Sequence, residues 1–223
     1  MADAIGQVLP LAVGVALSPL PIVAVVLMLV TPRARANGPA FVVGWLAGLT
    51  LVGAIFLPLA SSADASEDGQ PATWVTVLKL VLGALLLLVS ARQWRSRPHE
   101  GEEAPVPKWM GALEGFTAVK ALLAGAALSA ANPKNLLFGL GAAATIAQEG
   151  ISGGEQVVAY GVFALIAAVG VAVPVVIFFA LGDRAPWILG ALKEWMSRNN
   201  AVIMAVLLLV LGVKLIGDGI AGL

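Results

Sequence analysis

The chain has 223 residues, of which 60% are hydrophobic and 12% are charged, and its mean hydropathy is +0.96. A soluble domain has about 45–50% apolar and about 25% charged residues, so this composition indicates an integral membrane protein. The 13 basic residues balance the 13 acidic residues, which gives no case for nucleic-acid binding. The absence of cysteine and the single histidine exclude disulfides, thiolate chemistry and a multi-histidine metal site. We expect no cofactor, no metal and no enzymatic activity.

Six apolar stretches are long enough to cross a bilayer as helices, which takes about 20 residues each. They are residues 5–30, 41–60, 74–91, 117–147, 157–181 and 201–220. Strands of a membrane barrel instead form alternating segments of about 10 residues, a pattern that these stretches do not show. The sequence therefore predicts an all-α integral membrane protein with six transmembrane helices.

The charges of the connecting loops alternate strictly along the chain. The loops after the first, third and fifth stretches carry nine basic residues: Arg33, Arg35, Arg92, Arg95, Arg97, Lys108, Arg184, Lys193 and Arg198. The loops after the second and fourth stretches carry no Lys or Arg, and hold Asp64, Glu67, Asp68, Glu149 and Glu155. Because Lys and Arg resist translocation, the odd loops are predicted to be cytoplasmic. A multi-pass membrane protein with both termini outside follows.

Short sequence matches recur in the same order in the two halves of the chain. Ala16-Leu17-Ser18 matches Ala127-Leu128-Ser129, and the segment 77–83 resembles the segment 206–212. Because each half has three spans, the second half would enter the membrane upside down relative to the first. This is the inverted-repeat architecture of many secondary transporters, whose site lies at the midplane between broken helices. We predict a first three-helix repeat at 1–92, a cytoplasmic linker at 93–112 and a second, inverted repeat at 113–223.

Proline interrupts the first and the fourth stretches near their middle. Pro19 and Pro21 follow Ser18 in the first, and Asn132-Pro133 has the form of an N-cap followed by a first helical residue in the fourth. Proline removes a backbone donor, and the groups that this frees are tolerated in a membrane only where they are buried or line a cavity. Two half-helices are thus predicted to begin near the bilayer centre, where their positive dipole ends attract an anion.

Lys134 adds a full positive charge beside one of these helix ends. A charge at this depth costs at least about 2.5–3.5 kcal/mol, which makes it a candidate functional residue. The alternative is a pair of ordinary proline kinks, with Lys134 snorkelling to the interface. Together with neutral polar neighbours, the segment predicts a pocket for an anionic or strongly polar group. The candidate substrate-binding residues are Ser18, Pro19, Pro21, Ser129, Asn132, Pro133, Lys134 and Asn135.

The segments around these breaks resemble a known family. Leu17-Ser18-Pro19-Leu20-Pro21-Ile22, with the segments 31–38 and 41–45, resembles the glycopeptidolipid- and sulfolipid-addressing proteins of mycobacteria and their relatives. Asn132-Pro133-Lys134-Asn135 is similar to the Asn-Pro-Lys motif of the wider lysine-exporter superfamily. The resemblance covers essentially all six stretches. It implies an inner-membrane protein that helps to export complex glycolipids or lipopeptides to the cell envelope.

We therefore expect a secondary transporter that exports an anionic or polar-headed envelope lipid, a glycolipid or lipopeptide, across the inner membrane. Two alternatives stay open: an exporter of amino acids or small polar metabolites, and a non-transporting accessory scaffold for a larger lipid exporter. The chain has no G-x-x-x-x-G-K-[ST] motif, so active transport would need an ion gradient or the energy of a partner. The expected partners are the membrane, the substrate, and a second copy of the chain or a larger lipid-export complex, with no nucleic acid.

Overall fold

The computed structural model describes residues 1–62, 66–67, 70–71, 73–97 and 115–222, and most of them are helical. The α-helices are α1 (Ala2–Ala16), α2 (Pro19–Leu29), α3 (Ala34–Ser62), α4 (Thr73–Arg95), α5 (Ala118–Ala130), α6 (Pro133–Gln148), α7 (Gly153–Leu181) and α8 (Ala185–Ile220). Two short strands, β1 (Ser66–Glu67) and β2 (Gln70–Pro71), pair antiparallel, and the 3-10 helix η2 (Gly182–Arg184) precedes α8. The prediction of a helical protein is confirmed, while most of the predicted linker, residues 98–112, lies outside the described residues.

Three helical stretches among the described residues are long and apolar enough to cross a membrane. They are Ala34–Ser61, Thr76–Arg95 and Gly153–Ile220, and the last of these comprises α7, η2 and α8. The bent pair α1–α2 meets the same test when taken together, which gives a fourth candidate span, whereas α5 is a shorter apolar helix. By this criterion the described residues support a membrane protein with three or four candidate spans, and the six predicted spans are not confirmed.

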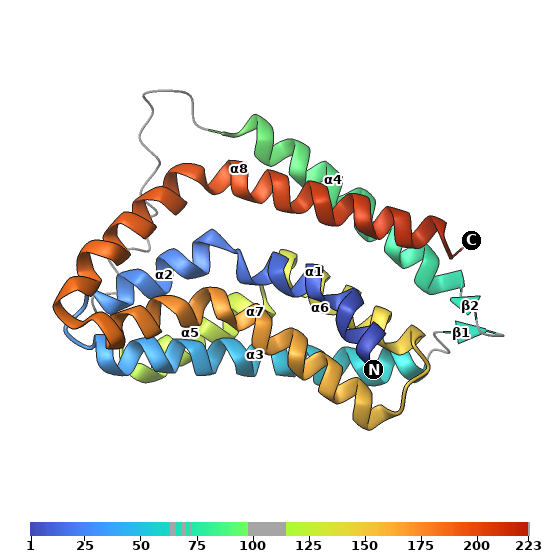
Figure 1. The fold of residues 1–223 in the computed structure, drawn as a ribbon, viewed down its shortest axis with the longest axis horizontal. Coiled ribbons are helices and arrows are strands. Elements are labelled where there is room, and N and C mark those ends of the chain that lie inside the picture. Colours follow the sequence, from blue (N-terminus) through green and yellow to red (C-terminus); the bar gives the residue numbers. More distant parts are fainter. Residues whose placement is uncertain (63–65, 68–69, 72, 98–114, 223) are drawn as a thin grey trace.

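The loop predicted between the fifth and sixth stretches, residues 182–200, is wrong for most of its length. Helix α8 begins at Ala185 and runs for 36 residues to Ile220. Proline occurs only in its first turn, where it fits a helix, and Glu194 and Arg198 form an i,i+4 ion pair on its surface, with 2.6 Å between Oε1 and Nη2. The loss of apolar character before position 201 therefore marks a more polar helical segment. Figure 1 shows this first part of α8 running at an angle to the rest.

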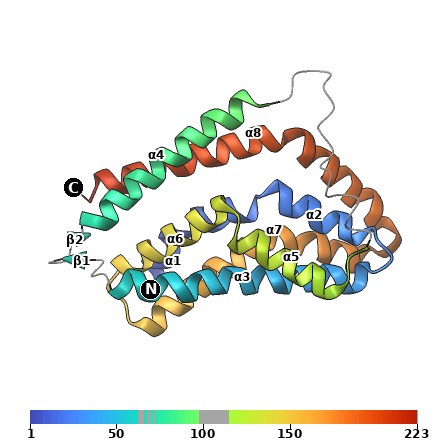
Figure 2. The same ribbon diagram turned by 180° about the vertical axis from the view of Figure 1, so that it is seen from behind.

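Both chain termini lie at the same end of the molecule, beside β1 and β2 (Figures 1 and 2). At this end Gln7 Nε2 donates a hydrogen bond to Glu149 Oε1 at 2.5 Å, which links the start of α1 to the end of α6. The connection between α2 and α3 and the turn at η2 lie at the opposite end. That end carries Arg33 and Arg184, with Asp183 beside Arg184 in η2.

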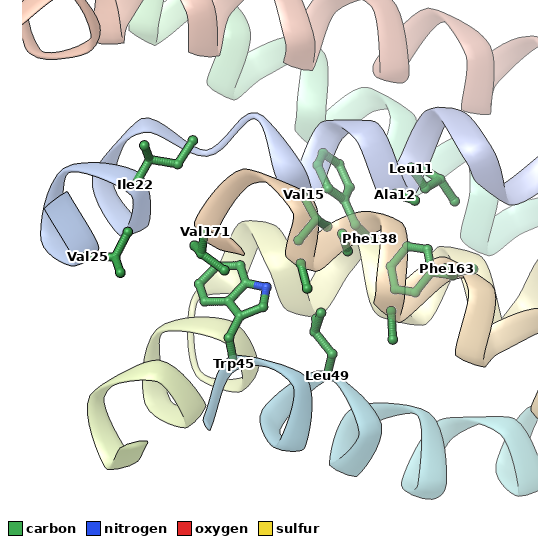
Figure 3. Close-up of a cluster of buried hydrophobic side chains, with 14 of the residues drawn as sticks. Leu11, Ala12, Val15, Ile22, Val25, Trp45, Leu49, Phe138, Phe163 and Val171 are labelled. Atoms are coloured by element: carbon green, nitrogen blue, oxygen red, sulfur yellow. The ribbon is translucent and has the colours of Figure 1, made fainter. Parts of the chain in front are cut away.

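The main apolar core lies where α1, α2, α3, α6 and α7 meet (Figure 3). Val15 of α1, Trp45 of α3, Phe138 of α6 and Phe163 of α7 are all fully buried there. Inside a bilayer, lipid tails are as apolar as these side chains, so helix association depends on close packing and interhelical hydrogen bonds. The core therefore fixes the relative positions of the two helix breaks described below.

Glycines permit three close helix contacts. A Cβ atom on Gly48 of α3 would lie 2.6 Å from Ala126 O of α5, and one on Gly170 of α7 would collide with Ala16 O of α1. Between α4 and α8, a Cβ on Gly83 would lie 2.9 Å from Gly212 O, and one on Gly212 would lie 3.0 Å from Gly83 O. Backbones can approach this closely only where the side chain is absent, as in other small-residue helix contacts in membranes.

Candidate substrate site at the helix breaks

The first break separates α1 from α2, and the two helices are bent by 53°. Ser18 precedes Pro19, the first residue of α2. Because proline has no N–H, Val15 O cannot receive its regular helical bond, and it accepts from Ser18 N at 3.2 Å and from Ser18 Oγ at 2.6 Å instead. In an unbroken helix Ser18 N would pair with Gly14 O. The break therefore leaves Gly14 O without a donor from its own helix.

Lys134 of α6 supplies this missing donor. Its Nζ atom donates to Gly14 O at 2.8 Å and to Ser18 Oγ. Since the single hydroxyl proton of Ser18 is given to Val15 O, Ser18 Oγ acts here as an acceptor. The Nζ atom also lies 5.3 Å from the ring centroid of the buried Phe138, within cation–π range. The ammonium is thus held at the C-terminal, electronegative end of α1.

The second break separates α5 from α6 and is completed within its own segment. Asn132 is the N-cap of α6, and its Oδ1 atom accepts from Lys134 N at 3.0 Å. Leu128 lies four residues before this cap, just as Gly14 lies four residues before Ser18, so the carbonyl oxygens of the two residues are equivalent. Asn135 Nδ2 donates to Leu128 O at 3.1 Å. Side chains of α6 therefore satisfy the equivalent backbone carbonyl at both breaks.

Asn135 keeps one further hydrogen-bonding atom. The residue is 1% exposed, and its Oδ1 atom has no hydrogen-bond partner among the described residues. Buried polar atoms are almost always paired, so a free acceptor at a helix break is a candidate contact for a donor such as a hydroxyl group. An ammonium with neutral partners and a free amide oxygen together supply one contact for an anion and one for a hydroxyl.

The structure brings together only some of the predicted site residues. Ser18 contacts the Lys134 ammonium directly, and Asn132 contacts the Lys134 backbone. Pro19 and Pro21 are buried in the first turn of α2, whereas Pro133 is exposed. Their role is therefore to shape the breaks, because a proline ring has no group to donate.

Ser129 has a different environment from the one that the repeat predicts. Its side chain is fully buried, and its Oγ atom donates to Ala126 O at 3.0 Å within α5. It lies where a Cβ on Gly48 of α3 would be, so it packs at the α3–α5 contact. Ser129 matches Ser18 in sequence, but the cap of the second break falls three residues later, at Asn132.

Two contributors to the site were missed by sequence reasoning. Gly14 contributes its carbonyl oxygen and Phe138 its ring. The carbonyl could have been found from the sequence. Where a helix ends before an N-cap residue and a proline, the backbone carbonyl four residues before the N-cap is left without a donor. No sequence signal identifies the lysine that reaches it from the other half of the chain.

A separate apolar pocket of about 140 Å³ lies between α3, α4 and α6. None of the predicted site residues lines it. Its lining residues are Phe56, Leu59, Ala60, Leu78, Leu140, Ala143 and Ala144.

Comparison with protein families gives one match over nearly the whole chain. The family described as Sap, sulfolipid-1-addressing protein, matches residues 8–221. Comparisons with curated proteins and with solved structures gave no match. The matched range includes both helix breaks and the contacts of Lys134, Asn132 and Asn135.

Proposed function

The chain belongs to the sulfolipid-1-addressing protein family, and on this premise we propose that it is a secondary transporter that exports an anionic or polar-headed envelope lipid across the inner membrane. The observation that carries the proposal is Lys134, a cation held between two broken helices by neutral partners only. Intramembrane charges mark substrate or ion pathways by default, because their insertion is costly. The proposed activity is transport without catalysis, in keeping with the absence of a nucleotide-binding motif.

We propose further that the chain forms six spans as two inverted repeats, with α5 and α6 together as the fourth span. Support comes from the packing of equivalent helices: α3 packs on α5 and α6 in the same way that α7 packs on α1 and α2. The equivalent glycines Gly83 and Gly212 approach each other between α4 and α8, as matched positions near a two-fold axis would. The Asn132-Pro133-Lys134 motif extends the proposal to membership of the lysine-exporter superfamily.

The proposed orientation places both termini outside the cytoplasm. The end of the bundle opposite the termini carries the basic connections, and the end with the termini carries Glu149 and Glu155. The retention of Lys and Arg on the cytoplasmic side supports this orientation.

An accessory scaffold is the second candidate function. The first part of α8 exposes Trp187 and Trp195 beside the basic residues Lys193 and Arg198. Tryptophan and arginine side chains are enriched in protein interfaces, and tryptophan also anchors helices in lipid headgroups. A scaffold would bind a larger lipid exporter through this segment and would move no lipid alone.

Flux measured with the purified protein separates these functions. The protein is reconstituted in liposomes that carry a short-chain, fluorescently labelled sulfated galactolipid in one leaflet, and movement to the other leaflet is followed by chemical quenching. We expect movement of the sulfated lipid in excess of the same lipid without sulfate. No movement of either lipid, in liposomes that contain folded protein, would favour the scaffold. Movement of free lysine alone would favour an amino-acid exporter.

A further inference from the structure

We propose that Lys134 is an exchangeable tether: without substrate it holds the end of α1 against α6, and an anionic group of the substrate takes the place of Gly14 O and releases α1. The inference rests on the proposed function and specifies its trigger as a sulfate, phosphate or carboxylate group. It concerns the motion of α1 relative to α6, which can be measured without any transport.

The first argument is that the first break has little to bind an anion without Lys134. Ser18 makes no side-chain cap bond to α2, and its hydroxyl donates back to Val15 O instead. Two of the first three residues of α2 are Pro19 and Pro21, which have no N–H group. Only the N–H of Leu20 is available among these three residues. An anion at this break therefore needs the Lys134 ammonium.

The second argument is that the charge of Lys134 is not neutralised. The ion pairs among the described residues are Glu194–Arg198 and Lys214–Asp218, and neither includes Lys134. Its two hydrogen-bond acceptors are a backbone carbonyl and a hydroxyl, both uncharged. Bonds between an ammonium and an anion are stronger than bonds to neutral acceptors, most of all away from water. An anionic oxygen should therefore displace Gly14 O.

The third argument is that the tether is a principal polar link between α1 and α6. The contact between α1 and α6 is otherwise apolar near the break, where a Cβ on Gly14 would lie 2.9 Å from Phe138 Cε2. Beyond the break, α2 starts at 53° to α1, so the end of α1 is not supported by a continuous helix. Release of Gly14 O leaves Leu17 and Ser18 as a hinge between α1 and α2.

The chain offers a clean test because it contains no cysteine. Spin labels are attached at Val13→Cys on α1, one turn before the hinge, and Leu123→Cys on α5, both at exposed positions. The distance distribution between the labels is measured by pulsed electron resonance in nanodiscs of neutral phosphatidylcholine. A single narrow distance is expected for the otherwise unchanged protein. Lys134→Met, which keeps the chain length and removes the charge, should abolish that narrow distance.

Two controls separate the tether from a general effect of lysine removal. Lys120→Met changes an exposed lysine of α5 and should leave the narrow distance in place. Lys134→Arg keeps the charge and should restore it. Gly14→Ala should broaden the distribution by a different route, because the added methyl group would collide with Leu211 of α8 and with the Phe138 ring and push α1 away.

Two anion arms then test the exchange. One adds sodium sulfate to the neutral nanodiscs, with sodium chloride of equal ionic strength as control, and the other replaces part of the lipid by sulfated galactosylceramide. In the protein with Lys134 intact, either sodium sulfate or the sulfated lipid should broaden the distance distribution as Lys134→Met does. In Lys134→Met, neither addition should change the distribution further. A response in the lipid arm alone identifies a headgroup as the trigger, and a response to sulfate alone identifies a free anion.

Two outcomes would overturn the tether. One is a narrow distance that persists in Lys134→Met, and the other is the absence of any response in both anion arms. If either occurs in a protein that still moves the sulfated lipid in liposomes, the proposed transport function stands and only the tether fails. If the tether behaves as expected but no lipid moves, the anion-linked motion of α1 belongs to a scaffold.

Discussion

The two helix breaks share a local design but differ in what completes them. At the second break, Asn132 caps α6 and Asn135 satisfies Leu128 O, so every contact lies between residues 128 and 135. At the first break, Ser18 makes no cap bond, and Gly14 O is satisfied by Lys134, which lies 120 positions further along the chain. The second break is complete in its own repeat, whereas the first depends on the other half of the molecule.

This difference follows from the two residues that come after the proline. Leu20 and Pro21 follow Pro19 in the first half, and Lys134 and Asn135 follow Pro133 in the second. An apolar side chain and a proline provide no donor, whereas an ammonium and an amide provide donors in two directions. A single polar segment on α6 can therefore satisfy both breaks. Only one polar segment has to be buried for both breaks, and that segment links the two halves of the chain.

The largest effect is expected from removal of the link between the halves. Lys134→Ala should abolish movement of the sulfated lipid in liposomes, because it removes the one cation at the breaks. Stability should change little. Two hydrogen bonds are lost, but so is the desolvation cost of a buried ammonium, and such terms largely offset each other. Flux and melting temperature are measured on the same reconstituted protein.

The matched control for this prediction is Lys120→Ala, which removes an exposed lysine from α5. It should leave both flux and melting temperature unchanged. Wild-type flux in Lys134→Ala would show that the ammonium has no part in transport and that the lysine only closes the first break.

A smaller effect is expected when the first break is made to resemble a continuous helix. Pro19→Ala provides an N–H group for Val15 O, which frees Ser18 N to pair with Gly14 O in the regular helical pattern. The protein should become more stable by about 1 kcal/mol, the typical net value of one hydrogen bond, and flux should fall because Lys134 loses its acceptor. A thermal melt and the flux assay measure the two changes. A gain in flux would contradict the assignment of the break as a functional element.

The equivalent change at the second break serves as comparison. Pro133→Ala lies at the first position of α6, where proline costs a helix little. Asn132 and Asn135 should keep the break in place, so the change should have less effect on flux than Pro19→Ala. Equal effects of the two substitutions would indicate that the first break does not depend on the other half of the molecule more than the second does.

The positions of both breaks could be predicted from the sequence, and their completion could not. A missing N–H at Pro19 and the cap-then-proline order at Asn132 are local properties, which act through the nearest turn of helix. The contact of Lys134 with Gly14 depends on how α6 packs against α1, which no local pattern specifies. The same limit applies to Ser129, whose match with Ser18 predicted a place in the site, whereas packing on Gly48 gives it another environment.

The fold shows a similar division. Long apolar stretches predicted α3, α4 and α7 well, because apolarity over a span length is a strong signal. The first part of α8 was predicted as a loop because it is less apolar, although it has no proline after its first turn. Loss of apolar residues indicates where a helix leaves the hydrocarbon, and only Pro, Gly or a cap indicates where it ends.

The smallest effect is expected from the two cap residues, and it gives the finest test of the comparison. Asn132→Ala removes a side chain that accepts from Lys134 N, and loss of such a cap costs about 1 kcal/mol of stability. Ser18→Ala removes a hydroxyl that makes no cap bond but pairs with Val15 O and with the Lys134 ammonium. Both partners keep a second bond, because the N–H of residue 18 still pairs with Val15 O and Lys134 still pairs with Gly14 O. Since no buried group is left unpaired, the change should cost less than Asn132→Ala. Unfolding in a mild denaturant, followed for both variants under the same lipid conditions, measures the difference. If Ser18→Ala is the more damaging of the two, the hydroxyl is needed to hold the ammonium, and the first break depends on Ser18 as much as on Lys134.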